Sequence, residues 1–74
     1  MKIPYINMQK TGEKIFYLRK KAGITVKEMQ DVFGFTTPQA IYKWQHGTAL
    51  PTIDNLVALA FLLNVTVDDI LVKE

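Results

Sequence analysis

The sequence predicts an all-α fold, a compact bundle of five helices in one small domain. Apolar residues recur at helical spacing in several short windows, and no window alternates strictly between apolar and polar residues as strands do. Residues that commonly end helices in the left-handed conformation stand where these windows stop: Gly23, Gly34, Gly47 and Asn64. With 74 residues and 49% apolar content, the chain suits one small core and is too apolar for disorder.

The first helix is expected to begin between residues 7 and 12 and to end at Gly23. Ile15 and Leu18 face inward at helical spacing. Cations suit the negative end of a helix dipole, and three stand in the last turn: Arg19, Lys20 and Lys21. An N-terminal arm, residues 1–10, precedes the domain of residues 11–74, and this arm either packs on the body or frays.

The next two helices are short and are joined at Gly34, which is expected to end the first of them. Thr25 and Glu28 form a capping box at its start, in which the side chain of each residue accepts a hydrogen bond from the backbone N–H of the other. The inward stripe of this helix is expected to hold Met29, Val32 and Phe33.

The second of these helices is expected over about residues 38–46, with Thr37 as its cap and Pro38 at its first position. Ile41 and Trp44 share its inward face. Because the connection is so tight, the two helices must cross steeply, and the second helix then projects from the body. A projecting helix with a polar outer face is suited to the major groove of DNA.

The fourth helix is expected to begin after Thr52, its cap, and to carry apolar residues on two sides. Its first stripe consists of Leu56, Leu59, Ala60 and Leu63. Its second stripe contains Val57 and Phe61, although a surface helix needs only one apolar face. The second stripe therefore needs a cover, which is either the N-terminal arm or a second protomer. Thr66 and Asp69 form a capping pair that opens a last short helix.

The composition argues against several kinds of site. Without cysteine the chain has neither disulfides nor thiolate metal ligands, and its single histidine cannot build a metal site. We therefore expect no metal, no cofactor and no small-molecule ligand. No apolar run reaches the roughly 18 residues that a membrane span needs, and the N-terminus does not read as a secretory signal. We expect a cytoplasmic protein that does not bind membranes.

The charge is polarised along the chain, although its net value is only +2. Residues 1–21 hold six basic residues and one acid, residues 22–48 are balanced, and residues 49–74 hold one basic residue and four acids. This pattern fits either an ordinary solvated surface or a basic face that meets phosphates while the acidic end points away.

An ordered set of landmarks runs through residues 12–71. They are Ile15, Leu18, Arg19, Gly23, Ile24, Thr25, Phe33, Gly34, Phe35, Ile41, Trp44, Gly47, Leu50, Pro51, Thr52, Leu56, Leu59, Ala60 and the segment 65–71. In this order and spacing they resemble the helix-turn-helix domain of the phage repressor and Cro-like (XRE-type) family. The resemblance implies a five-helix fold that binds double-stranded DNA and regulates transcription without enzymatic activity.

Three departures from the family pattern concern the two central helices. The turn between them is one residue longer, near Thr36. Gln30 replaces the usual small alanine, so we expect this glutamine and the longer turn to be linked changes. Gln45 replaces the acid that commonly follows the tryptophan, which leaves Arg19 either with a neutral partner or free for a phosphate.

The resemblance implies candidate contacts to DNA, and the apolar residues least needed by a single five-helix core are candidate contacts to a second protomer. The candidate base contacts are Gln39, Ala40 and Lys43. The candidate backbone contacts are Arg19, Thr25, Lys27, Thr37, Tyr42, His46 and Thr48. The candidate dimer contacts are Val57, Phe61 and Val72. A glutamine pairs bidentately with adenine, but Gln39 also fits an exposed helix surface, and Lys43 reaches guanine or, more commonly, a phosphate.

Three classes of function follow. The first is a sequence-specific transcriptional regulator, a repressor or an activator, that binds as a homodimer because one short helix reads few base pairs. The second is a protein-interaction module, such as the antitoxin of a toxin–antitoxin pair, that uses the wide apolar surface of the fourth helix. An enzyme is disfavoured, because no nucleophile–base pair, metal cluster or phosphate loop can be assembled.

Overall fold

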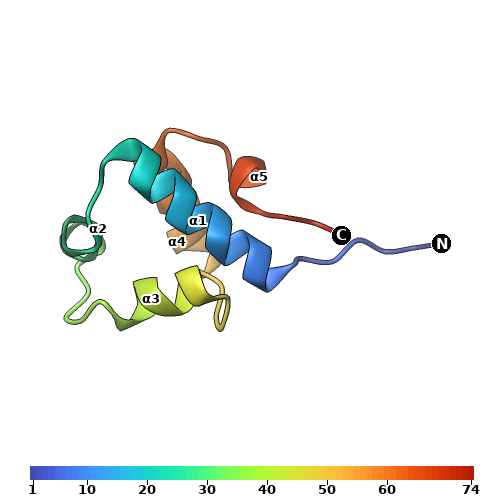
Figure 1. The fold of residues 1–74 in the computed structure, drawn as a ribbon, viewed down its shortest axis with the longest axis horizontal. Coiled ribbons are helices and arrows are strands. Elements are labelled where there is room, and N and C mark those ends of the chain that lie inside the picture. The colour runs from blue at the N-terminus through green and yellow to red at the C-terminus, as the bar shows by residue number, and fades with distance from the viewer.

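Five α-helices follow one another in the computed structural model, which describes all 74 residues. They are α1 (Met8–Ala22), α2 (Val26–Phe33), α3 (Gln39–His46), α4 (Ile53–Leu63) and α5 (Val67–Ile70). In Figure 1, α1 lies across the middle of the molecule, α3 lies below it and α4 lies behind it. The prediction of an all-α fold with five helices is confirmed. None of the helices combines the length and the apolar character needed to cross a membrane.

Side chains cap four of the five helices. Thr25 with Glu28 at α2, and Thr66 with Asp69 at α5, form the two expected capping boxes. The caps of α1 and α4 are Asn7 and Thr52. The four residues expected to end helices are all left-handed: Gly23, Gly34, Gly47 and Asn64. Local signals in the sequence thus account for most helix boundaries.

The start of α3 differs from the expectation. Pro38 itself is the N-cap residue, and no side chain caps the helix. The Tyr42 N–H donates to the Pro38 carbonyl oxygen at 3.2 Å, so the first helical hydrogen bond closes on the proline. The expected cap at Thr37 is wrong, because the proline takes the cap position and leaves Thr37 one residue outside the helix.

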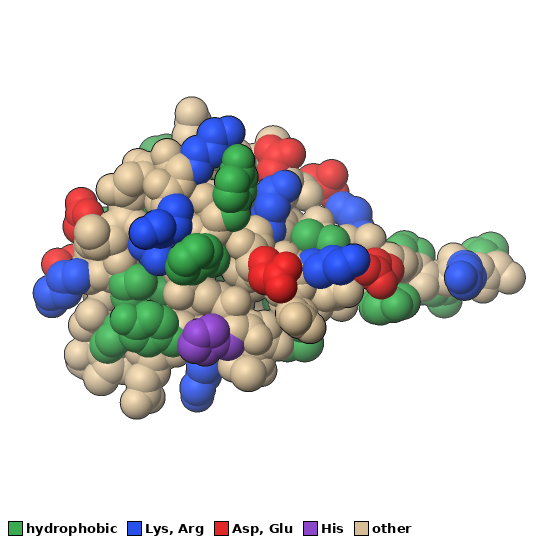
Figure 2. Space-filling model, in the orientation of Figure 1, with side chains coloured by type: hydrophobic (Ala, Val, Ile, Leu, Met, Phe, Trp, Pro, Cys, Tyr) green, Lys and Arg blue, Asp and Glu red, His purple; other side chains and the backbone are tan.

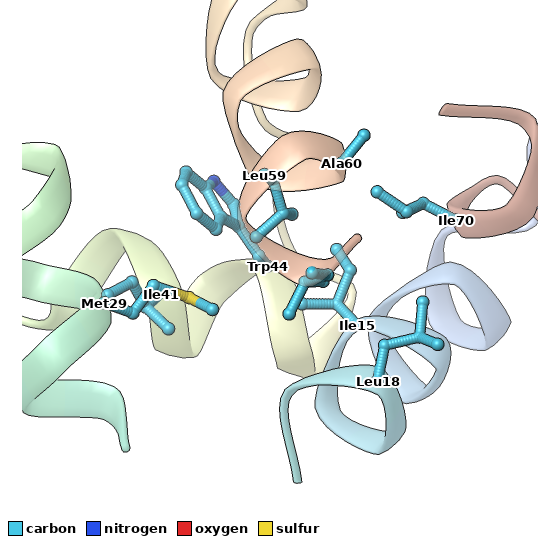
Figure 3. Close-up of a cluster of buried hydrophobic side chains, with 9 residues drawn as sticks. Ile15, Leu18, Met29, Ile41, Trp44, Leu59, Ala60 and Ile70 are labelled. Atoms are coloured by element: carbon cyan, nitrogen blue, oxygen red, sulfur yellow. The ribbon is translucent and has the colours of Figure 1, made fainter. Parts of the chain in front are cut away.

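The hydrophobic core lies where α1, α3 and α4 meet, with α2 and α5 at its edges. Its buried members are Ile15, Leu18, Met29, Ile41, Trp44, Leu59, Ala60, Leu63 and Ile70. Figure 3 shows the Trp44 ring lying close to Leu59 of α4. The inward placement of Ile41 and Trp44 is confirmed. Val32, expected in the inward stripe of α2, is instead 64% exposed, because Met29 and Phe33 already fill the side of α2 that faces the body.

The two ends of the chain pair with each other. Tyr5 exchanges two backbone hydrogen bonds with Glu74, both 2.9 Å long, and the Asn7 N–H donates to the Val72 carbonyl oxygen at 2.8 Å. The termini leave the bundle side by side (Figure 1) and form a narrow projection. Helix α1 begins at Met8, within the expected arm.

The arm does not cover α4. Ile3 of the arm is 81% exposed, while Val57 and Phe61 are 57% and 83% exposed. Of the two covers that the sequence leaves open, the arm is excluded, because its backbone is paired with the C-terminal residues instead. Ile53, 80% exposed, precedes Val57 by one helical turn. Together these three residues form the exposed stripe of α4 (Ile53, Val57 and Phe61).

Candidate nucleic-acid interface

The outward face of α3 is polar and carries no acid. Its exposed side chains, at positions i, i+3, i+4 and i+7 of one helix face, are Gln39, Tyr42, Lys43 and His46. Ile41 and Trp44 on the opposite side are 0% and 4% exposed, and their burial fixes which face of α3 points outward. The Tyr42 and His46 rings stack with centroids 6.3 Å apart. This face offers hydrogen-bonding groups and a cation to a partner.

Ala40, the remaining expected base contact, lies at the edge of this face. It is half-buried and packs against the hydrophobic core. Only part of the residue is therefore open to a partner, whereas Gln39 and Lys43 are exposed.

Three aromatic rings hold α2, the turn and α3 together. The rings of Phe33 and Phe35 stack with centroids 5.3 Å apart. Both rings meet Trp44 edge-on, at 5.5 and 5.8 Å. Aromatic pairs in these geometries stabilise beyond the area they bury. The arrangement supports the steep crossing visible in Figure 1, where α2 is seen nearly end-on and α3 lies across the view.

Gln30 ties α2 to the turn that follows it. Its side-chain amide donates to the carbonyl oxygen of Phe35 at 3.2 Å, and the Phe35 N–H donates to the Gln30 carbonyl oxygen at 3.1 Å. An alanine at position 30 has no donor for the first of these bonds. The expected link between Gln30 and the turn therefore has a physical basis.

Two glycines let α1 lie directly against α3. A Cβ atom added at Gly12 would stand 2.5 Å from the Trp44 carbonyl oxygen, and one added at Gly47 would stand 2.7 Å from the Cα atom of Gln9. Sequence reasoning passed over Gly12, although an isolated glycine inside an amphipathic helix commonly signals such a packing contact.

Six of the seven expected backbone contacts are exposed and lie in or beside α2 and α3: Thr25, Lys27, Thr37, Tyr42, His46 and Thr48. Lys27 forms an ion pair with Asp31 at 3.1 Å, four residues on. At α2, the Thr25 N–H donates to the Glu28 carboxylate at 3.0 Å, and this hydrogen bond lowers the pKa of Glu28. Asp31 therefore places a negative charge beside Lys27, and Glu28 places one at the start of α2.

Arg19, the seventh expected backbone contact, is buried. Only 8% of the residue is exposed. Its Nε–H donates to Gln45 Oε1 at 2.8 Å, and one Nη donates to the Ile24 carbonyl oxygen at 2.8 Å. Of the two alternatives that the sequence leaves open, the structure shows the neutral partner, Gln45. The guanidinium is therefore hydrogen-bonded within the protein, and its contact with a phosphate stays a prediction.

Val72, a candidate dimer contact, lies beside α1. Its N–H donates to the hydroxyl of Thr11 at 3.0 Å, and its carbonyl oxygen accepts from Asn7. The residue is half-buried and lies in the segment that pairs with the arm, whereas Val57 and Phe61 belong to α4.

Comparison with known proteins agrees with this geometry. A family model described as helix-turn-helix matches residues 15–70, about three quarters of the chain and all of α2 to α5. A comparison with curated proteins finds no match. Members of the matching family are DNA-binding regulators and are generally not enzymes. The chain belongs to the XRE-type, phage repressor and Cro-like helix-turn-helix family.

Proposed function

We propose that the protein is a sequence-specific regulator that binds double-stranded DNA with α3 in the major groove. The observation that supports this most directly is the acid-free outward face of α3, whose opposite side is anchored by Ile41 and Trp44. A helix in the major groove meets polar base edges and is flanked by anionic phosphates. Polar and basic side chains suit both surroundings.

Gln39 and Lys43 are the proposed readers of base sequence, with Ala40 as an apolar contact. Gln39 is the first residue of α3, and the N-terminal residues of a recognition helix contact base edges in this class of domain. Lys43 lies one helical turn further along the same face. Its ammonium group reaches either a guanine or a phosphate, and phosphates receive most contacts in such complexes.

Six exposed residues in or beside α2 and α3 are the proposed contacts to the DNA backbone. They are Thr25, Lys27, Thr37, Tyr42, His46 and Thr48. Hydroxyl groups, lysines and free backbone N–H groups at helix starts are common donors to phosphate oxygens. Such contacts set the position of α3 on the duplex and leave the reading of sequence to the bases.

We further propose that two copies bind together and regulate transcription by occupying their site, in the cytoplasm and without catalysis. Two recognition helices about one helical turn of DNA apart double the number of bases read. The exposed stripe of α4 supplies apolar side chains for contact between copies, and Val72 is a further candidate.

The same exposed stripe favours a second function, that of an antitoxin or another protein-interaction module. Three large apolar side chains at 57–83% exposure are suited to a protein partner. A toxin-sized open reading frame beside the gene would support this reading. Tight co-purification of its product with this chain, lost in a Phe61→Asp variant, would establish it.

Selection from a random pool of DNA duplexes, followed by footprinting, tests the leading proposal. If four to six phosphates are neutralised, the logarithm of the binding constant should fall with the logarithm of salt concentration with a slope of about −4 to −5. Failure to enrich any sequence, or an affinity that does not change with salt, would contradict the proposal.

A further inference from the structure

Arg19 carries a buried positive charge without a counter-ion. The residue is 8% exposed, and its two hydrogen-bond partners, the Gln45 side-chain oxygen and the Ile24 carbonyl oxygen, are both neutral. No carboxylate lies within 4.0 Å of the guanidinium, since the ion pairs of the protein all involve lysines. The Phe16 ring, 5.4 Å away, covers it in a cation–π contact. Burying a charge without an opposite charge is costly, so the site favours an anion.

A hollow adjoins this guanidinium between the end of α1 and the start of α2. Its volume is about 200 Å³, and its lining residues are Arg19, Lys20, Gly23, Ile24 and Thr25. No acid is among them, and Lys20 takes part in no ion pair. One water occupies roughly 30 Å³ of the liquid, so the hollow has room for the oxygens of a phosphate group.

The surroundings of the hollow are also basic. Lys20 Nζ lies 6.0 Å from the Phe16 ring, and Lys21 Nζ lies 6.0 Å from the Tyr17 ring. Figure 2 shows basic and apolar side chains, with some acidic ones among them, on the face over α1. The start of α2 adds the positive end of a helix dipole, which the carboxylate of Glu28 in the capping box partly offsets.

We infer that this hollow binds a phosphate group, which supplies the counter-charge that Arg19 lacks. In the DNA complex this group is a phosphate of the duplex backbone, and in the free protein it is inorganic phosphate. The DNA part of the inference rests on the proposed function, whereas the inorganic phosphate part does not. Gln45 is then a specificity-determining position, because a neutral residue there leaves the charge of Arg19 available.

The first test compares thermal unfolding of the full chain in sodium phosphate and in sodium chloride of equal ionic strength. At about ten times the Kd for phosphate, the melting temperature should rise by roughly 6–11 °C above the chloride value. Gln45→Glu places a carboxylate where Gln45 Oε1 now accepts from Arg19, so this variant should melt higher in chloride and lose the phosphate-dependent rise. Gln45→Met removes the hydrogen bond but leaves the charge unpaired, so it should keep the rise.

Two lysine variants distinguish phosphate binding in the hollow from a general attraction of anions to the protein. Lys20→Gln removes a lining cation and should reduce the phosphate-dependent rise, whereas Lys27→Gln, outside the hollow, should keep it. An equal rise in the unmodified chain, Gln45→Glu and Lys20→Gln would overturn the inference, as would the absence of any rise in the unmodified chain.

The second test measures DNA affinity against salt for a selected duplex. Gln45→Glu should weaken binding several-fold and reduce the log–log salt slope by about one, the change expected when one phosphate contact is lost. Gln45→Met should leave the slope unchanged. An unchanged slope in Gln45→Glu would show that DNA does not place a phosphate in the hollow. If no duplex binds at all but the phosphate-dependent rise is lost in Gln45→Glu and reduced in Lys20→Gln, the anion site stands and the proposed function fails.

Discussion

Gly12 of α1 lies against the backbone of Trp44 in α3, where an added Cβ atom would stand 2.5 Å from the Trp44 carbonyl oxygen and 2.6 Å from that of Gln45. Those oxygens belong to helix backbone and cannot turn aside as the end of a flexible side chain can. The glycine therefore sets how closely α1 approaches α3, and through α3 it sets the position of the candidate recognition face.

Gly12→Ala should destabilise the fold by about 1–3 kcal/mol, the usual cost of overpacking. This destabilisation is opposite to the effect of helix propensity, which favours alanine over glycine by about 1 kcal/mol in an unobstructed helix. Urea unfolding followed by circular dichroism measures the change. A variant as stable as the unmodified chain, or more stable, would show that the two helices separate easily.

Gly34 and Gly47 are a matched pair that also tests how much an added Cβ atom at a close backbone contact destabilises the fold. Both are left-handed, with φ of 70° and 73°, so alanine is strained at either position. An added Cβ meets nothing within 4 Å at Gly34, but at Gly47 it would stand 2.7 Å from the Cα atom of Gln9. Gly47→Ala should therefore lower the free energy of unfolding more than Gly34→Ala does.

The parts of the fold that sequence analysis predicted correctly rest on short-range signals. The caps at Thr25 and Thr66 and the left-handed Asn64 depend on residues within one helical turn, so the sequence shows them directly. Pro38 is an exception. The sequence is compatible with this proline either at the first helical position or at the cap position, and the structure places it at the cap. The outward face of α3 was likewise predictable, since the spacing of Ile41 and Trp44 decides which side is buried.

The pairing of the chain ends and the surroundings of Arg19 were not predictable in this way. Tyr5 and Glu74 are 69 residues apart, and the paired segments are too short to show strand alternation. Arg19 had two compatible partners in the sequence, a neutral residue and a phosphate. Only the tertiary arrangement, which brings Gln45 Oε1 to 2.8 Å from its Nε, shows that the first is present.

Trp44→Ala should unfold most of the protein rather than merely release DNA. The side chain is 4% exposed and contacts both Phe33 and Phe35. Truncating a large buried aromatic costs about 3–5 kcal/mol, and the single core of a chain this short rarely supplies more than about 3–5 kcal/mol of net stability. Circular dichroism and the melting temperature test this. Native helical content and an unchanged melting temperature would contradict the packing described for α3, and Trp44→Phe should be affected less.

Glu74→Gln should weaken the pairing of the chain ends in a pH-dependent way. The hydrogen bond from Lys10 Nζ, 3.1 Å long, is the largest cause that lowers the pKa of Glu74, followed by that from Asn7 Nδ2 at 3.0 Å. A carboxylate with a lowered pKa in the folded state stabilises it above the ordinary value of 4.5. This contribution disappears as the pH falls through the lowered pKa.

Melting temperatures of the unmodified chain and Glu74→Gln should therefore differ near pH 7 and converge as the pH falls below 4.5. Glu13→Gln, at an exposed acid of α1 without an ion pair, is the matched control and should follow the unmodified chain throughout. If the difference in melting temperature between the unmodified chain and Glu74→Gln stays constant with pH, the effect of the substitution comes from packing and not from charge.

Gln39→Ala should cost about 1–3 kcal/mol on a selected duplex and little on random DNA, because a bidentate contact to a base discriminates between sequences. Lys43→Ala should weaken both more evenly if its partner is a phosphate. Titration of both variants against both duplexes, at one salt concentration, measures the four dissociation constants. Equal losses on the two duplexes for Gln39→Ala would show that Gln39 does not read a base.

Phe61→Asp should prevent two copies from binding one site while leaving the fold intact. Phe61 is 83% exposed, so a charge there costs the monomer little, but it would be buried and unpaired between two α4 helices. Sedimentation with and without a selected, near-palindromic duplex gives the stoichiometry. Val32→Asp, at an apolar side chain 64% exposed on α2, is the matched control and should preserve the 2:1 complex. A 1:1 complex for the unmodified chain, or a 2:1 complex that Phe61→Asp leaves unchanged, would exclude a dimer through the exposed stripe of α4.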